Sequence, residues 1–170
     1  MPDIIGQLPL RGCCKAFGFA ANPWIYFAAP LFTQAELEFN RKTRDILVDN
    51  GWTVFLPQED QDSDMTQPET TYAGVIRGLQ SSSIVVAVID GADADSGTAY
   101  EIGYAVALQK SVFCLRTDSR NGPRGNRVNL MLETETTACT SIEELLDQLR
   151  QLRNGYDAPE RPSHLPRTST

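Results

Sequence analysis

Apolar residues fall into short continuous runs that alternate with longer segments of helical spacing. The runs at residues 24–29, 52–56, 83–89 and 111–115 are rich in aromatic and β-branched side chains. Such runs are typical of strands buried on both faces of a sheet. A weaker strand is predicted near residues 135–139. Strands alternating with helices predict an α/β fold of the flavodoxin or Rossmann type, a doubly wound, mainly parallel five-stranded sheet with helices on both faces.

The first predicted helix has clear start and stop signals. Thr33 and Glu36 form a T-x-x-E capping box, in which two orphan backbone donors are satisfied reciprocally. The helix is predicted to stop at Gly51, a residue type favoured just after helix ends. Its predicted buried face consists of Ala35, Phe39, Thr43, Ile46 and Leu47.

Later elements are predicted in the same way. A helix is expected over residues 69–80, after a polar loop at residues 57–68 that is expected to stay unpacked. A second loop, rich in glycine and arginine, spans residues 117–127. Ser141 and Glu144 predict another capping box at the start of a final amphipathic helix.

Composition places the chain among ordinary globular proteins, with 41% hydrophobic and 22% charged residues. We expect an N-terminal extension at residues 1–22 of no assigned role, one domain at residues 23–153 and a disordered tail at residues 154–170. The net charge of −7 argues against nucleic acid and anionic membranes as main partners. No apolar run approaches the length of a membrane span.

The cysteines and the single histidine limit the kinds of catalytic and metal site that the chain can form. The four cysteines have no C-x-x-C spacing, and Cys114, in a predicted strand, is expected to be a small buried hydrophobe. The only histidine, His164, lies in the polar tail, so neither histidine-based catalysis nor a histidine-rich metal site is expected. We predict a reduced, cytoplasmic location, without a metal or another cofactor.

One carboxylate stands out from its surroundings. The aliphatic run at residues 84–89 is followed by an acidic loop that ends at Gly97. The helix predicted after this loop is apolar except for Glu101. A charged group in such a helix is costly unless something offsets it, and a helix N-terminus favours anions. Open α/β sheets bind ligands at the carboxyl ends of their strands. Glu101 therefore suits a nucleophile or a substrate-binding carboxylate.

Other candidates at strand ends have ordinary structural explanations as well. Tyr26 alone could be a core aromatic, Asp95 a helix cap, and Gln61 part of a solvated loop. The chain contains no G-x-G-x-x-G after the first strand, no G-x-x-x-x-G-K-[ST] and no G-x-S-x-G. Dinucleotide binding, P-loop chemistry and α/β-hydrolase chemistry are therefore poor fits.

The combination of three segments is more specific than any one of them. The sequences YFAAPLF at residues 26–32, DSGTAYEIGYA at residues 95–105 and NLM at residues 129–131 occur in this order. Together they resemble the nucleoside 2-deoxyribosyltransferase family, and the resemblance covers about residues 25–149. The D-x-G-x-x-x-E-x-G-x-A pattern is fairly specific to this superfamily.

The resemblance implies a retaining pentosyl transfer between 2'-deoxynucleosides and free purine or pyrimidine bases. Glu101 would attack the anomeric carbon and form a covalent deoxyribosyl-enzyme, which a second base then captures. Tyr26 would hydrogen-bond this nucleophile and tune its basicity. Asp95 would hold the deoxyribose hydroxyls.

The resemblance also implies a set of substrate-binding residues. Phe32 would line the base pocket, Gln61 would contact the base edge, and Ala28 and Met131 would also bind substrate. Asn129 would reach the sugar 5'-hydroxyl in the neighbouring subunit's site. This implies a homo-oligomer with shared active sites, whether dimer or hexamer.

One departure from the family pattern concerns the leaving base. Family members often carry an Asp on the helix before the third strand, placed to protonate the base, and the corresponding position here is Val75. The usual Ala-Asp before that strand is Ser82-Ser83. The base is then protonated by water or by another acid, or turnover is impaired; the acids in the appropriate loop are Asp60, Asp62 and Asp64.

Two alternative functions stay open. An N-glycosidase of 2'-deoxynucleoside 5'-monophosphates would use water as the acceptor, but the carboxylate of Asp95 would repel the substrate's phosphate. A non-catalytic nucleoside-sensing domain is kept open by Val75. The preference for purine or pyrimidine bases is not determined by the sequence.

Overall fold

The computed structural model describes residues 24–60, 67–119 and 129–157. The predicted N-terminal extension at residues 1–22 lies outside these residues, and so do residues 158–170 of the tail predicted at residues 154–170.

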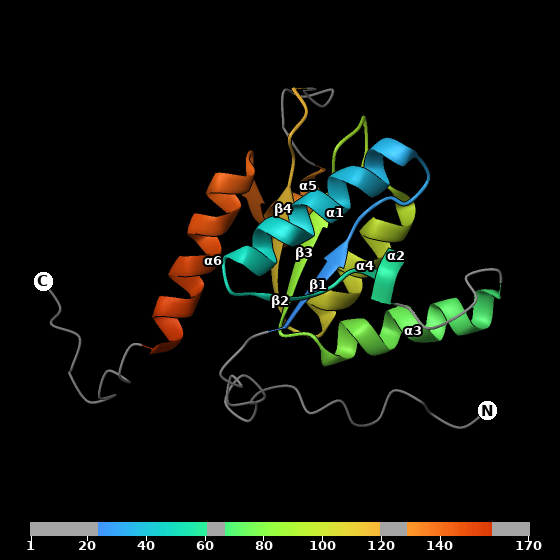
Figure 1. Cartoon of the computed structure of the whole chain (residues 1–170), viewed down its shortest axis with the longest axis horizontal. Helices are drawn as coiled ribbons and strands as arrows, with labels where there is room; N and C mark the ends of the chain where they lie inside the picture. Colours follow the sequence, from blue (N-terminus) through green and yellow to red (C-terminus); the bar gives the residue numbers. More distant parts are fainter. Residues whose placement is uncertain (1–23, 61–66, 120–128, 158–170) are drawn as a thin grey trace, which may run out of the picture.

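The core of the fold is a five-stranded sheet in the order β2-β1-β3-β4-β5, with every neighbouring pair parallel (Figure 1). This confirms the predicted doubly wound α/β architecture. The strands are β1 (Trp24–Ala28), β2 (Thr53–Phe55), β3 (Ile84–Val88), β4 (Ser111–Leu115) and β5 (Thr137–Cys139).

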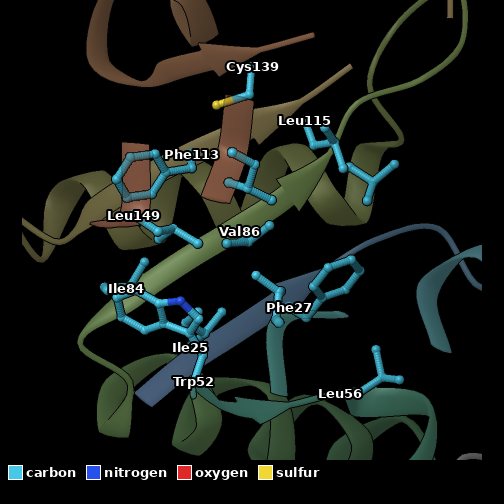
Figure 2. Packing of buried hydrophobic residues seen from close by; sticks show 13 residues of the cluster. Ile25, Phe27, Trp52, Leu56, Ile84, Val86, Phe113, Leu115, Cys139 and Leu149 are labelled. Atoms are coloured by element: carbon cyan, nitrogen blue, oxygen red, sulfur yellow. The ribbon is translucent and has the colours of Figure 1, made fainter. Parts of the chain in front are cut away.

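Side chains alternate between the two faces of the sheet, as the two-residue period of a strand requires. Ile25 and Phe27 of β1 join a cluster with side chains of β3, β4 and the C-terminal helix, shown in Figure 2. Tyr26 and Ala28 point to the opposite cluster, with Val85 of β3. The position of Tyr26 in the pleat therefore decides which helices it meets.

Helices cover both faces of the sheet (Figure 1). α1 and α6 pack on the face that carries Ile25 and Phe27, and α3 and α4 pack on the face that carries Tyr26. None of the helices in the described residues is long and apolar enough to cross a membrane. The helices are α1 (Gln34–Asp49), α2 (Pro57–Asp60), α3 (Pro68–Ser81), α4 (Ser96–Ala107), α5 (Leu130–Glu135) and α6 (Ile142–Asp157).

The strand order reverses between β1 and β3. β1 connects to β2 on one side through α1, whereas the chain leaving β2 crosses past β1 through α3 to reach β3. A crevice outside the carboxyl ends of the strands at such a reversal is where ligands bind in doubly wound sheets. β1 carries Tyr26, and the segment after β3 carries Asp95 and Glu101.

The capping box of α1 is confirmed: Thr33 Oγ1 accepts from Glu36 N, and the Glu36 carboxylate accepts from Thr33 N. The predicted burial of Ala35 is wrong, because Ala35 is exposed and Asn40 is buried instead. Asn40 donates to Pro30 O and to Gln58 Oε1, so its burial is offset by hydrogen bonds.

The prediction of an unpacked loop at residues 57–68 is partly wrong. Residues 57–60 form α2, in which Pro57 is buried and Gln58 Nε2 donates to Leu37 O. Residues 61–66 lie outside the described residues. At the other end of the chain, α6 continues to Asp157, beyond the domain boundary predicted at residue 153.

The second capping box forms only in part. Ser141 Oγ accepts from Glu144 N, as predicted. The Glu144 carboxylate, however, accepts from the backbone N and the hydroxyl of Thr140, one residue earlier than the pattern predicts.

Candidate active site

A tyrosine and a glutamate meet at the centre of the candidate site. Tyr26 lies fully buried on β1, and its hydroxyl donates to Glu101 Oε1 over 2.6 Å. Glu101 is half-buried in the first half of α4. The two residues are 75 positions apart in the sequence, so only the pairing of β1 with the β3–α4 unit brings them together.

The electrostatics of the pair keep the tyrosine as the donor. Burial, and then the nearby Glu101 carboxylate, raise the pKa of the Tyr26 phenol far above its usual value. The phenol therefore stays protonated at neutral pH and donates its proton to Glu101. A short hydrogen bond from a hydroxyl to a carboxylate is among the stronger hydrogen bonds in proteins.

The carboxyl group of Glu101 has a pKa close to neutral pH. Its pKa is raised to about 7 by the combined effect of three causes: burial raises the pKa most, the hydrogen bond from Tyr26 lowers it, and the charge of Asp95 raises it. Catalytic carboxylates in clefts often have pKa values moved toward the working pH in this way. A substantial fraction of Glu101 is therefore ionised at pH 7 and can act as a nucleophile.

Asp95 has a structural contact that accounts for part of its position. It is the N-cap of α4, and its Oδ2 accepts from Thr98 N over 3.0 Å. Its Oδ1 makes no hydrogen bond within residues 24–60, 67–119 and 129–157. The cap therefore leaves one oxygen of Asp95 available while its charge acts on Glu101.

The loop between β3 and Asp95 is tied to the loop after β4. Asp90 accepts from Thr117 N over 2.5 Å, from the Thr117 hydroxyl over 2.7 Å and from Asp118 N over 3.0 Å. In return, Gly91 N donates to Asp118 Oδ2, and Arg116, which is nearly buried, donates to Gly91 O. This reciprocal set of bonds fixes the start of the segment that leads to Asp95.

The other predicted site residues come from several elements. Phe32 and Met131 are both 79% exposed in the single chain, and Ala28 is fully buried at the end of β1. Asn129 caps α5, with its Oδ1 accepting from Met131 N. Gln61 lies outside the described residues.

Val75 faces the cluster that contains Tyr26. It is a partly buried residue of α3 packed against that cluster, where it supplies no proton. Of the alternative acids named above, Asp60 accepts from Leu56 N over 2.6 Å, whereas Asp62 and Asp64 lie outside the described residues. No group of three or more potential metal ligands occurs in the part of the chain that the structure describes.

Several residues around the site were not among the predictions. Asp90 and Arg116 could have been suspected as polar residues that directly follow buried strands. Gly78 lies inside α3 and packs against Tyr26, and a glycine inside a helical pattern is a weak signal of close packing. Cys114 is buried as predicted, and burial raises its pKa, so its thiol is poorly reactive.

The sheet is doubly wound, and the carboxylate–phenol pair lies where its strand order reverses. The fold and the site therefore define an α/β protein whose candidate active site is built around a carboxyl group. The sequence model of the nucleoside 2-deoxyribosyltransferase family matches residues 25–134. The chain belongs to this family.

Solved structures agree with this assignment at the level of the fold. A conserved protein from Enterococcus faecalis V583 is 28% identical, with a TM-score of 0.66 over 78% of this chain and 99% of that chain. A 2-deoxyribosyltransferase from Bacillus psychrosaccharolyticus is 24% identical, with a TM-score of 0.63 over 73% and 90%. A 2-deoxyribosyltransferase from Leishmania mexicana is 20% identical, with a TM-score of 0.62 over 76% and 97%. No curated protein matches the chain.

Proposed function

We propose that the protein transfers 2-deoxyribose between nucleobases by a retaining mechanism in which Glu101 is the nucleophile. The observation that carries this proposal is the 2.6 Å hydrogen bond between the buried Tyr26 phenol and Glu101, in a chain of this family. A carboxylate nucleophile and an oxocarbenium-like transition state are the chemistry of retaining glycosyl transfer.

The first step forms an ester and breaks the glycosidic bond. Tyr26 occupies Oε1 of Glu101, which leaves Oε2 to attack the anomeric carbon of the bound 2'-deoxynucleoside. The electron pair of the glycosidic bond passes to the base nitrogen, and the departing base takes up a proton from water. Oδ1 of Asp95, which makes no hydrogen bond within the described part of the chain, is suited to accept one from a sugar hydroxyl.

The second step reverses the first with a different base. A nitrogen of the acceptor base attacks the anomeric carbon, the ester bond breaks, and the electron pair returns to Glu101 as a carboxylate. The acceptor nitrogen releases its proton to solvent. Two inversions at the same carbon give net retention.

The chain has no acid at the position from which many family members protonate the leaving base. General acid catalysis contributes about 10²–10⁴-fold in typical enzymes, and Val75 removes the acid found at this position in many family members. We therefore propose slow turnover, faster with bases that leave readily without protonation.

The defining experiment is incubation of the protein with deoxyinosine and free adenine, followed by chromatography of the products. The proposal expects deoxyadenosine together with hypoxanthine. Hypoxanthine with free deoxyribose would instead indicate the hydrolase, and a dependence on a 5'-phosphate would favour the nucleotide N-glycosidase. Unchanged substrates, with nucleoside binding that survives Glu101→Ala, would indicate the sensing domain.

We also propose that the active protein is a homo-oligomer with shared sites. Large exposed apolar side chains occur on α3, α4 and α5, all on the face of the sheet that carries Tyr26; they are Tyr72, Tyr100, Leu130 and Met131. The outer face of α4 carries no charge, because Glu101, its only charged residue, forms the bond with Tyr26. Exposed apolar side chains that gather on one face are typical of protein–protein contacts.

Mixing two inactive variants tests this arrangement. If Asn129 serves the neighbouring site, Glu101→Ala and Asn129→Ala each lose activity, and subunit exchange in a dimer restores about a quarter of it, because half of the dimers carry one intact site. Mixtures that stay inactive after verified exchange would contradict sharing through Asn129.

A further inference from the structure

Helix α3 contains a glycine where a helix would gain from alanine. Gly78 is buried in the interior of α3 (Pro68–Ser81). Glycine in a helix interior is destabilising relative to alanine because it loses more backbone entropy on folding. A buried glycine at such a position is explained when a side chain would not fit.

The space that a side chain would need at Gly78 is filled by two aromatic rings. A Cβ atom there would lie 2.9 Å from Cδ2 and Cε2 of Tyr26 and 3.0 Å from Cε1 of Phe55. These distances are below van der Waals contact, so the rings would have to move. The Tyr26 ring is fully buried and fixed by its bond to Glu101, so it cannot move without cost to that bond.

Phe55 holds a second side of the same ring. The centroids of Phe55 and Tyr26 lie 5.7 Å apart, with 24° between the ring planes, which is a stacked arrangement. Phe55 and Gly78 also line a cavity of about 580 Å³ between α3 and the edge strand β2. They therefore form the wall that separates the Tyr26 ring from open space on the side of β2.

We propose that Gly78 and Phe55 are positioning residues that hold the Tyr26 phenol against Glu101. Gly78 lets α3 approach the ring, and Phe55 stops the ring from turning toward the cavity. Both residues contact the Tyr26 ring and act through it. The proposal deepens the proposed function, because it concerns the group that tunes the nucleophile.

The expected consequence of moving the ring has a definite sign. The hydrogen bond from Tyr26 opposes the rise in the pKa of Glu101 that burial causes. Weakening that bond therefore raises the pKa of Glu101 further. A merely structural role for Gly78 would lower stability without moving the titration of a residue on another helix.

The test measures the titration of Glu101 directly. In protein labelled with ¹³C at glutamate carboxyl carbons, Glu101 is assigned by its loss in Glu101→Gln, and its titration midpoint is compared in wild type and Gly78→Ala. We expect the midpoint to rise by about one pH unit, as for partial loss of a hydrogen bond to a charged group. On a Tyr26→Phe background, Gly78→Ala should cause no additional rise, since the bond is already absent.

Two further variants keep the test decisive. Phe55→Leu removes ring volume instead of adding it and should raise the midpoint in the same direction, which covers the case in which Gly78→Ala does not fold. Gly155→Ala makes the same exchange in α6, at a position where the new Cβ meets nothing within 4 Å beyond its own stretch of helix, and should leave the midpoint unchanged. An unmoved midpoint in folded Gly78→Ala or in Phe55→Leu, or an equal rise in the Tyr26→Phe background, would overturn the proposal.

This experiment also separates failure of the positioning role from failure of the proposed function. The titration needs no turnover, so it reports on Gly78 and Phe55 even if no deoxyribosyl transfer occurs. Transfer activity together with an unmoved midpoint would refute only the positioning role. The expected midpoint shift in a protein without transfer activity would refute only the transferase.

Discussion

Replacement of Tyr26 by phenylalanine isolates the contribution of one hydroxyl group to the candidate nucleophile. The substitution keeps the buried ring and its stacking on Phe55, and removes only the donor that lies 2.6 Å from Glu101 Oε1. The lost hydrogen bond opposes the effect of burial on Glu101. The pKa of Glu101, about 7 in the wild type, should therefore rise.

The size of the effect follows from the strength of such bonds. Hydrogen bonds to charged groups contribute about 1.5–3 kcal/mol, and a pKa change of one unit corresponds to about 1.4 kcal/mol, so the acid limb should move upward by about 1–2 pH units. Below the wild-type midpoint, activity should fall by about 10–100-fold, because the ionised fraction falls by that factor. Above pH 9 the two enzymes should converge.

The assay is the pH dependence of kcat/KM for deoxyribosyl transfer, which reports ionisations of the free enzyme. Tyr104→Phe is the matched control, because it removes a phenol that accepts from Gln80 on the outer side of α3 and α4. Its acid limb should coincide with that of the wild type. An equal loss of activity at every pH in Tyr26→Phe, with an unmoved midpoint, would refute the reasoning.

Three further predictions concern the acids of the site. Glu101→Gln should stabilise the fold above pH 7 by about 3 kcal/mol and have no effect below pH 4. The reason is that the raised pKa of Glu101 makes wild-type stability fall as the pH rises from about 4.5 to 7. Urea unfolding at several pH values measures this, and a stability difference between the two proteins that does not change with pH would contradict it. Asp95→Asn should keep the cap of α4 but remove a charge that raises the pKa of Glu101, so the acid limb of kcat/KM should move to lower pH, the reverse of Tyr26→Phe. Asp90→Ala loses three hydrogen bonds and should destabilise the protein by about 2 kcal/mol in urea unfolding, whereas Asp93→Ala, at an exposed neighbour, should change little.

The fold was predictable from sequence where burial leaves an unambiguous pattern. Residues 84–89 are buried without exception, so the aliphatic run of β3 has one interpretation. The short helix α2 was predicted as loop, because its four residues are mostly polar. Its structure depends on Gln58, which bonds to Leu37 O and to Asn40 on α1. Such contacts between distant residues leave no local periodicity to detect.

The candidate site was predictable in its chemistry but not in its support. Glu101 is conspicuous because it is the only charged residue in an apolar helix, and its pairing with Tyr26 was expected from the family resemblance. Gly78 and Phe55 were not identified, because their role exists only once α3 packs against β1. The hydrogen bonds between Asp90 and the loop after β4 likewise depend on β3 and β4 lying side by side.

The most direct test of the central claim is to trap the ester on Glu101. The protein is incubated with deoxyinosine in the absence of an acceptor base, denatured rapidly in acid, digested and analysed by tandem mass spectrometry. We predict a deoxyribosyl group on the peptide that contains Glu101, located at that side chain and absent from Glu101→Gln. Deoxyribosyl transfer that persists in Glu101→Gln, or an adduct on another residue, would contradict the account.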